Sequence, residues 1–269
     1  YRDFYTHYRD RETMVYVGAN DGMLHAFTSW QYNSATSSFS QPTSTTEAMG
    51  DEIWAYIPQA LLPHLKWLAD PNYTHVYYAD IKPKVFDAQI LPDNTHYTDS
   101  DSEADWGTFL MLGLNHGGKT ISVDAANGFS SDRTFSSSYS LIDITEPRSP
   151  KLLWERTYDN LQATTSFPAI VKVDDSWYAV FGSGPDFCSG NSTQVANVYV
   201  VDLATGSPHS TGSTDYLFQT SYSYASLNSP VSLDKELNYN VDAIYFGSSY
   251  SSTNDTPWSG KVHKITIPW

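Results

Sequence analysis

The sequence predicts an all-β protein, and among all-β architectures it favours a β-propeller over a sandwich or a barrel. Helical periodicity is scarce, whereas short runs of β-branched and aromatic residues recur along the chain between clusters of Gly, Asn, Asp, Ser and Pro. A strand–turn–strand pattern also repeats within the sequence. Together these features predict antiparallel four-stranded blades with irregular loop insertions, in an incomplete or reduced propeller.

The predicted strands share short length, branched or aromatic side chains and flanking turn residues. They are residues 14–17, 24–27, 53–57, 76–80, 109–114, 140–143, 152–155, 169–173, 177–182, 198–202, 242–247 and 261–265. One helical segment is predicted at residues 59–68, where Leu61, Leu65 and Leu68 share a face. Pro63 limits this helix to a short piece, because proline lacks the amide hydrogen that a helix interior needs.

An internal repeat carries the preference for a propeller. "VYVGANDGMLHAF" (15–27) is a strand, a turn and a second strand, and "AIYFGSSYSSTNDTPWSGKVHKI" (243–265) repeats the plan with a longer connection. "NVYVVDLATGSPH" (197–209) repeats the first half. Such hairpins are typical of blades, because a blade cannot bury both of its faces alone. His25 and His263 occupy equivalent positions, which predicts packing rather than catalysis or metal binding.

The composition restricts the class of partner. The chain has 30 acidic and 15 basic residues and a net charge of -15, which opposes association with nucleic acid and suits divalent cations. No apolar run approaches the roughly 20 residues that a membrane-spanning helix needs. Cys188 is the single cysteine, so no internal disulfide is possible. The excess of acidic over basic residues suits an exported protein.

A single domain over residues 1–269 is expected, because no stretch shows a sustained change of composition. The polar segments 33–52, 93–105 and 128–140 are interpreted as insertions within or between blades. The chain starts "YRDFYTHYRD", without an initiator Met or a signal region, which predicts a part of a longer, processed protein.

One loop carries a candidate metal site. Oxygen-bearing side chains occupy every second position from 234 to 242: Asp234, Glu236, Asn238, Asn240 and Asp242. A loop with ligands at positions 1, 3, 5, 7 and 9 can curl around Ca²⁺, with position 7 offering its backbone carbonyl. Three carboxylates and an amide oxygen suit Ca²⁺ and are poor ligands for Zn²⁺, which prefers His and Cys.

The residues alone leave a second interpretation open. An EF-hand has Gly at position 6 and a bidentate Glu at position 12, where this loop has Tyr239 and Tyr245. The loop is therefore not an EF-hand, and a polar β-turn with solvated carboxylates is the alternative. The acidic run at 98–105 lacks the alternating pattern and is interpreted as a solvated loop.

The chain resembles the C-terminal β-propeller of PilY-type proteins, the tip-associated adhesin and biogenesis factors of bacterial type IV pili. The resemblance runs through most of the chain in order. It rests on "VYVGANDGMLHAF", "EIWAYIPQALLPHLKWL", "WGTFLMLGLNHGGKTISVD", "SLIDITEPRSPKLLWE", "TSFPAIVKVDDSWYAVFGSGP", "VYVVDLATG" and "VDAIYFGSSYSSTNDTPWSGKVHKI". Domains of this family are larger than 269 residues, so missing blades are expected rather than a reduced propeller.

The resemblance implies a calcium loop, with Asp234, Glu236, Asn238 and Asp242 as side-chain ligands and Asn240 as the carbonyl donor. The family usually has Asp where Glu236 stands and often Gly where Tyr239 stands, so the loop departs from the family pattern at these two positions.

The resemblance also implies function: a non-enzymatic pilus-tip and biogenesis protein that acts in adhesion, pilus assembly and control of extension and retraction. The implied partners are minor pilins at the pilus tip and host-cell or abiotic surfaces. The implied location is extracellular, at the cell surface or pilus tip, after export through the periplasm.

Two other functions stay open. One is a carbohydrate- or protein-binding propeller without a calcium switch, which the 8 Trp and 20 Tyr residues would suit. The other is a quinoprotein-like enzyme, which the lone Cys188 disfavours because many of these enzymes use a vicinal cysteine pair. No hydrolase elbow, zinc motif or phosphate loop is present, and "HGGKT" (116–120) is interpreted as a tight turn.

Overall fold

The computed structural model describes residues 1–41, 48–96, 104–127, 130–186, 194–209, 214–251 and 258–267. Helical elements are few: α1 (Arg2–Tyr8) and the 3₁₀ helices η1 (Gln59–Ala69) and η2 (Ala125–Asn127). Cys188 and most of the acidic run 98–105 lie outside the described residues. No helix in the described part of the chain is both long and apolar enough to cross a bilayer.

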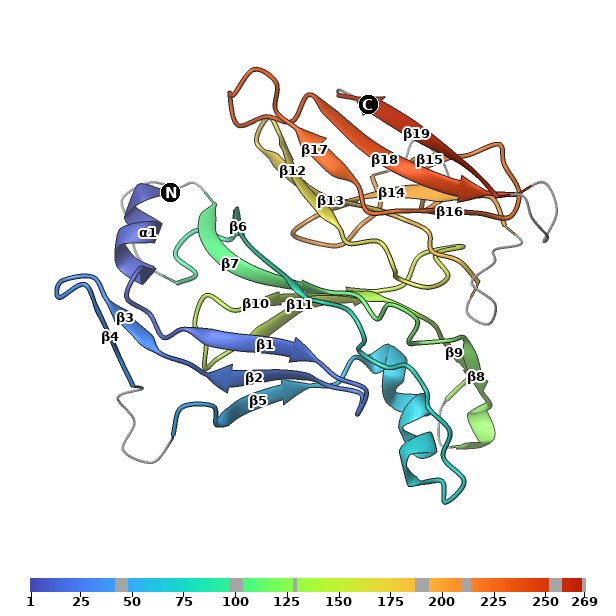
Figure 1. Ribbon diagram of the computed structural model, residues 1–269, viewed down its shortest axis with the longest axis horizontal. Coiled ribbons are helices and arrows are strands. Elements are labelled where there is room, and N and C mark those ends of the chain that lie inside the picture. The colour runs from blue at the N-terminus through green and yellow to red at the C-terminus, as the bar shows by residue number, and fades with distance from the viewer. Residues whose placement is uncertain are drawn as a thin grey trace.

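The strands form four main antiparallel sheets, stacked from the bottom to the top of Figure 1. The first sheet contains β1 (Met14–Gly18), β2 (Leu24–Thr28) and β5 (Glu52–Tyr56). The second contains β6 (Lys84–Leu91), β7 (Asp105–Leu112), β10 (Tyr139–Asp143) and β11 (Lys151–Arg156). The third contains β12 (Ala169–Val173), β13 (Ser176–Gly182), β14 (Asn197–Asp202) and β15 (Phe218–Gln219).

The fourth sheet is built around β18 (Ala243–Tyr250), which pairs with β19 (Ser259–Thr266) along its whole length. β16 (Ala225–Leu227) and β17 (Val231–Leu233) pair with opposite ends of β18. Two small hairpins, β3 (Gln31–Asn33) with β4 (Ser38–Ser40) and β8 (Ile121–Val123) with β9 (Arg133–Phe135), lie outside the four sheets. Consecutive antiparallel sheets of this kind are the blades that the repeat predicted.

The core lies between neighbouring sheets, because alternate residues of each strand point to opposite faces. On β7, Leu110 and Leu112 pack with Leu24 of the first sheet, whereas Phe109 and Met111 pack with residues of the third. The third sheet repeats this division, and its Val180, Val198 and Val200 pack with the fourth sheet through Leu227, Ile244 and Phe246. Each inner sheet is therefore buried on both faces.

One predicted strand is wrong: residues 76–80 form no strand. The segment is held by separate hydrogen bonds instead of by pairing with a strand. The Tyr78 amide donates to Asn20 Oδ1 at 2.9 Å, and the Ala79 amide donates to the Ala19 carbonyl at 3.2 Å. Tyr78 is fully buried and its hydroxyl donates to the carbonyl of His64. The aromatic side chain of Tyr78 is therefore part of the core, although its backbone pairs with no strand.

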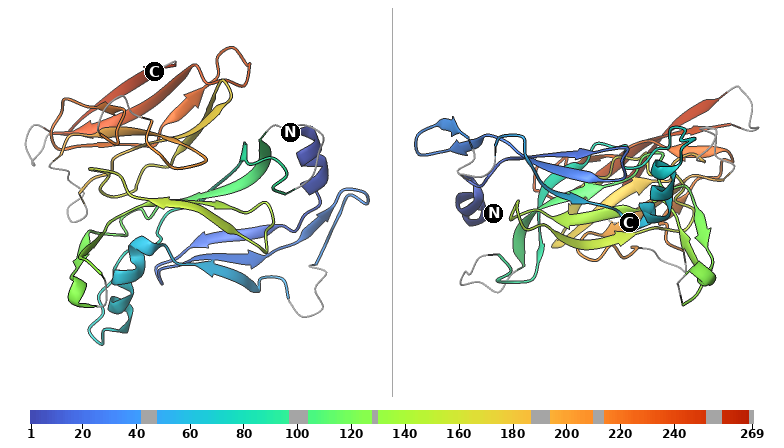
Figure 2. Two further views of the ribbon diagram at one scale, coloured as in Figure 1. Left: turned by 180° about the vertical axis from the view of Figure 1, so that it is seen from behind. Right: turned by 90° about the horizontal axis from the view of Figure 1, so that it is seen from below.

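Two further differences concern element length and type. β6 follows Pro83 and was not predicted, and its pairing with β7 extends β7 back to Asp105, four residues before the predicted start. The predicted helix is present, but as the 3₁₀ helix η1 with Pro63 inside it. η1 and the β8–β9 hairpin project from the same end of the molecule, as both views in Figure 2 show.

Candidate functional site

The candidate calcium loop, residues 234–242, joins β17 to β18 at an outer corner of the fourth sheet (Figure 1). Its base is closed by the Asp242 amide, which donates to the carbonyl of Leu233 at 2.9 Å. Beside it, the Val241 amide donates to the carbonyl of Lys172 on β12 at 3.0 Å. The loop is thus tied to its own sheet and to the preceding one.

Asp234 and Asp242 both turn their carboxylates inward, onto the backbone of the loop. Asp234 accepts from the amides of Asn238 at 3.2 Å and Tyr239 at 2.7 Å, one on each oxygen. Oδ2 of Asp242 accepts from the amides of Lys235 at 2.6 Å and Glu236 at 3.3 Å. The first and last acids of the predicted ligand set therefore hold the loop in a curl.

The two asparagines place amide oxygens on the same loop. Oδ1 of Asn238 accepts from the Asn240 amide at 2.9 Å. Oδ1 of Asn240 is buried and has no hydrogen-bond partner among the described residues. A buried, unpaired acceptor is costly unless something satisfies it. The sequence predicted only the backbone carbonyl of Asn240 as a calcium ligand, so its side-chain oxygen is an additional candidate ligand.

Glu236 is exposed and lies outside this inward arrangement. Nowhere in the described part of the chain do three or more His, Cys, Asp or Glu residues gather closely enough to hold a metal ion. The three carboxylates are therefore not a ready-made cluster. The donor set still fits a hard cation, because every candidate ligand offers oxygen and one buried oxygen is unpaired.

Leu237 and Tyr239 form the tip of the loop, and both have left-handed backbones, with φ of 56° and 68°. Their side chains are 84% and 87% exposed, so packing within the chain does not compensate for this strain. Glycine is the residue that adopts such a conformation without cost. At position 6, where an EF-hand has glycine, this loop therefore has a strained tyrosine.

We expect Tyr239→Gly to raise the free energy of unfolding by about 1 kcal/mol, because it removes left-handed strain and loses no buried contact. Urea unfolding of both proteins measures this change. Lys235→Gly is the matched control, since Lys235 is exposed in the same loop and is not among the described non-glycine residues with positive φ. It should destabilise the chain slightly. An equal loss of stability in both variants would contradict the prediction.

The two histidines of the repeat are held by neighbouring side chains, as expected for packing positions. His25 lies between two carboxylates, with Nε2 2.9 Å from Asp21 Oδ2 and Nδ1 3.1 Å from Glu52 Oε2. His263 stacks on Phe246, and its Nε2 is 2.8 Å from the hydroxyl of Ser248. The sequence did not indicate the carboxylates around His25, because Glu52 comes from another strand.

The polar segment 128–140, predicted as an insertion, has an unforeseen role. Its described part contributes β9 and the following serines to a polar cavity beside η1. Three Ser or Thr side chains from β9 and the residues after it gather there with Thr157, which follows β11, but serine-rich sequence alone is equally typical of a solvated loop. The cavity could not be predicted from the sequence, because it depends on the pairing of β9 with β8 and on the contact of β9 with η1.

The chain is a β-propeller module. This class is defined by its stacked antiparallel sheets and its hairpin repeat, and its candidate site is a loop rather than a deep cleft. Comparison with known proteins assigns the family. The family model of the PilY1 beta-propeller domain matches residues 1–254, so the chain belongs to this family. A solved structure, the Pseudomonas aeruginosa PilY1 C-terminal domain, has the same fold, with a TM-score of 0.56 and 22% identity.

Two relatives agree with the family assignment. A type IV pilus biogenesis factor PilY1 homolog of Xylella fastidiosa (strain Temecula1 / ATCC 700964) is 30% identical over 210 residues, 77% of this chain. PilY1 of Pseudomonas aeruginosa (strain UCBPP-PA14) is 29% identical over 213 residues, also 77% of this chain. The match spans only 13% and 14% of these two proteins, and the fold comparison covers 91% of this chain and 38% of the solved chain.

Proposed function

We propose that the chain is a non-enzymatic, calcium-binding module of a type IV pilus biogenesis protein, exposed at the cell surface or the pilus tip. The observation that carries the calcium proposal is the inward position of the Asp234 and Asp242 carboxylates on one loop. The family assignment supports the pilus context, because the relatives are type IV pilus biogenesis factors.

Bound calcium would be held by the side chains of Asp234, Asn238 and Asp242 and by an oxygen of Asn240. Glu236 is the fifth ligand predicted from the sequence, and it would have to turn inward from its exposed position. The ion would neutralise carboxylates that otherwise repel one another on a chain of net charge -15. The chain's own contribution is a loop that is already curled and tied to β12.

This arrangement links the loop to the adhesive and assembly functions that we propose for the module. Ordering of the loop by calcium would fix the exposed tip, Leu237 and Tyr239, relative to the fourth sheet. A fixed tip loses less conformational entropy when it contacts a partner. Minor pilins at the pilus tip and host-cell or abiotic surfaces are the proposed partners, and pilus extension and retraction are the proposed processes.

Calcium titration by calorimetry tests the proposal, with Asp242→Asn beside the parent chain. We expect one saturable site in the parent and at least about tenfold weaker binding in the variant, because one anionic ligand is lost. The asparagine oxygen can still accept from the Lys235 and Glu236 amides, so the loop should keep its path.

Asp174→Asn is the matched control, since Asp174 is an exposed acid in the turn between β12 and β13. It removes the same charge from the chain and should leave the calcium affinity unchanged. A parent chain that is folded but binds no calcium would refute the metal site. The loop would then be the polar turn that the residues alone also allowed.

A further inference from the structure

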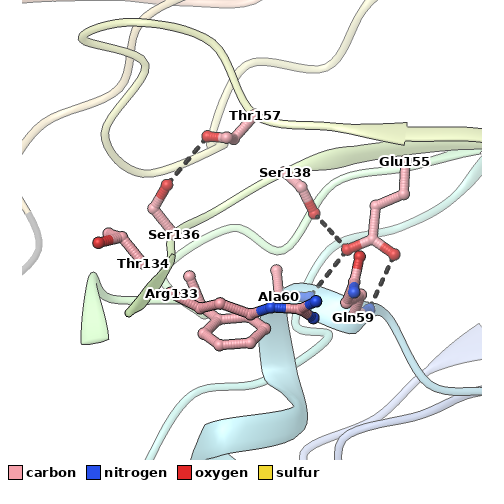
Figure 3. A pocket seen from close by; sticks show the side chains of 9 residues that line it. Gln59, Ala60, Arg133, Thr134, Ser136, Ser138, Glu155 and Thr157 are labelled. Carbon is pink, nitrogen blue, oxygen red and sulfur yellow. Dashed lines mark hydrogen bonds between the residues drawn. The ribbon is translucent and has the colours of Figure 1, made fainter. Parts of the chain in front are cut away.

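A polar cavity of about 240 Å³ lies beside the first turn of η1, at the end of the molecule where the β8–β9 hairpin projects. Figure 3 shows the side chains that line it, which come from η1, from β9 and the serines after it, and from β11 and Thr157. Three segments that are distant in the sequence therefore meet at one cavity.

Glu155 forms part of the wall of this cavity. Its Oε2 accepts from the Tyr56 hydroxyl at 2.7 Å and the Gln59 amide at 2.8 Å. Its Oε1 accepts from the Ala60 amide at 2.9 Å and the Ser138 hydroxyl at 3.1 Å. Two bonds on each oxygen satisfy the carboxylate, which also caps the first amides of η1. Glu155 thus fixes the cavity and has no lone pair left to bind a cation.

The other polar groups of the lining are hydroxyls, the Gln59 amide and the Arg133 guanidinium, and Ala60 and Phe135 add apolar surface. The hydroxyls of Ser136 and Thr157 are 3.0 Å apart, and either can donate to the other. In Figure 3 this pair lies on one side of the cavity, with Gln59 and Arg133 on the other. The hydroxyls and the amide can both donate and accept, whereas the guanidinium only donates. These groups face one another across a space that holds more than one water molecule.

Charge and size restrict the ligand. The Glu155 carboxylate and the net charge of -15 oppose an anion, and Arg133 opposes a cation. The hydroxyl-rich wall would leave unpaired donors and acceptors against an apolar ligand. The volume is below the about 300–1,000 Å³ of pockets for drug-sized ligands. A small, neutral ligand with several hydroxyl groups satisfies all of these conditions.

We propose that this cavity binds one monosaccharide unit of a glycan, through Ser136, Thr157, Gln59 and Arg133. The proposal is independent of the calcium loop, which lies on the fourth sheet, whereas the cavity lies beside the second sheet. Binding that persists in EDTA therefore separates the two proposals.

Saturation-transfer-difference NMR of the 269-residue chain with glucose, galactose, mannose and N-acetylglucosamine tests the inference. We expect saturation transfer to at least one of the four sugars, with and without EDTA. The Ser136→Ala/Thr157→Val double variant should lower that signal at least about fivefold, because it removes two hydroxyls at nearly constant volume.

Ser176→Ala is the control for a lost hydroxyl, since Ser176 is exposed on β13 away from the cavity. It should bind the sugar like the parent. Arg133→Met is a second test that leaves both hydroxyls in place and should also weaken binding. The absence of transfer from all four sugars, or equal transfer in the parent, the double variant and Arg133→Met, would overturn the proposal.

Discussion

Replacing Gly117 with alanine is expected to prevent stable folding of the chain. A Cβ atom at this position would lie 1.9 Å from the carbonyl oxygen of Tyr78 and 3.0 Å from that of Leu114. Both neighbours are backbone atoms, and Tyr78 is held by bonds from its amide to Asn20 and from its hydroxyl to His64. Relief of the clash therefore requires movement of a buried segment. We expect destabilisation of about 4 kcal/mol or more.

Urea unfolding followed by tryptophan fluorescence measures this loss, and recovery as insoluble protein would agree with it. Gly260→Ala is the control. Gly260 lies on exposed β19, where the nearest atom to an added Cβ is the Ser248 carbonyl oxygen at 3.4 Å. It should change stability by less than about 1 kcal/mol. A folded Gly117→Ala variant with stability similar to that control would show that the Tyr78 segment can move.

Gly117 also shows how far the sequence predicts the fold. "HGGKT" was interpreted as a tight turn. A turn is present slightly earlier, where the Gly117 amide donates to the Leu114 carbonyl at 2.8 Å, and it includes only His116 and Gly117 of that stretch. The turn residues are local and carry that information. The Tyr78 carbonyl that excludes any side chain at position 117 comes from a segment that was predicted as a strand. Its approach depends on tertiary structure and leaves no local pattern.

Among the described residues, every strand of five or more residues except β6 was predicted. The β1–β2 and β12–β13 pairs have clear turns between branched or aromatic runs, and both hairpins are present. β15, β16 and β17 are only two or three residues long, so periodicity cannot distinguish them from loop. They exist because a longer neighbouring strand offers an edge, which is a property of the assembled sheet.

The candidate loop was predictable in position but not in the orientation of its side chains. Alternating oxygen-bearing residues before a strand located residues 234–242. The hydrogen bonds show that Asp234 and Asp242 turn inward, whereas Glu236 is exposed and Asn240 buries an unpaired oxygen. Local spacing assumes that every second residue points the same way. The left-handed backbones of Leu237 and Tyr239 interrupt that alternation.

Replacing Asp143 with alanine should cost about 3–5 kcal/mol of stability at neutral pH, because it breaks a buried pair and leaves a polar partner behind. Oδ2 of Asp143 is 2.7 Å from Nε2 of His96, and the two side chains are only 2% and 5% exposed. Oδ1 accepts from the Thr145 amide at 2.9 Å. Urea unfolding measures the loss, and a cost below about 1 kcal/mol would contradict it.

The pH dependence of Asp143→Asn separates the charge of this carboxylate from its shape. Burial raises the pKa of Asp143, but hydrogen bonds from His96 and Thr145 outweigh it and hold the pKa below its usual value. A depressed pKa in the folded state contributes stability above the unfolded value of about 3.9, and that stability is lost as the pH falls through the folded value. The stability gap between the parent and Asp143→Asn should therefore be widest near neutral pH and shrink in acid.

Asp174→Asn, which replaces an exposed acid, should show a small gap at every pH. A gap for Asp143→Asn that stays constant into acid would mean that shape, not charge, makes this pair stabilising.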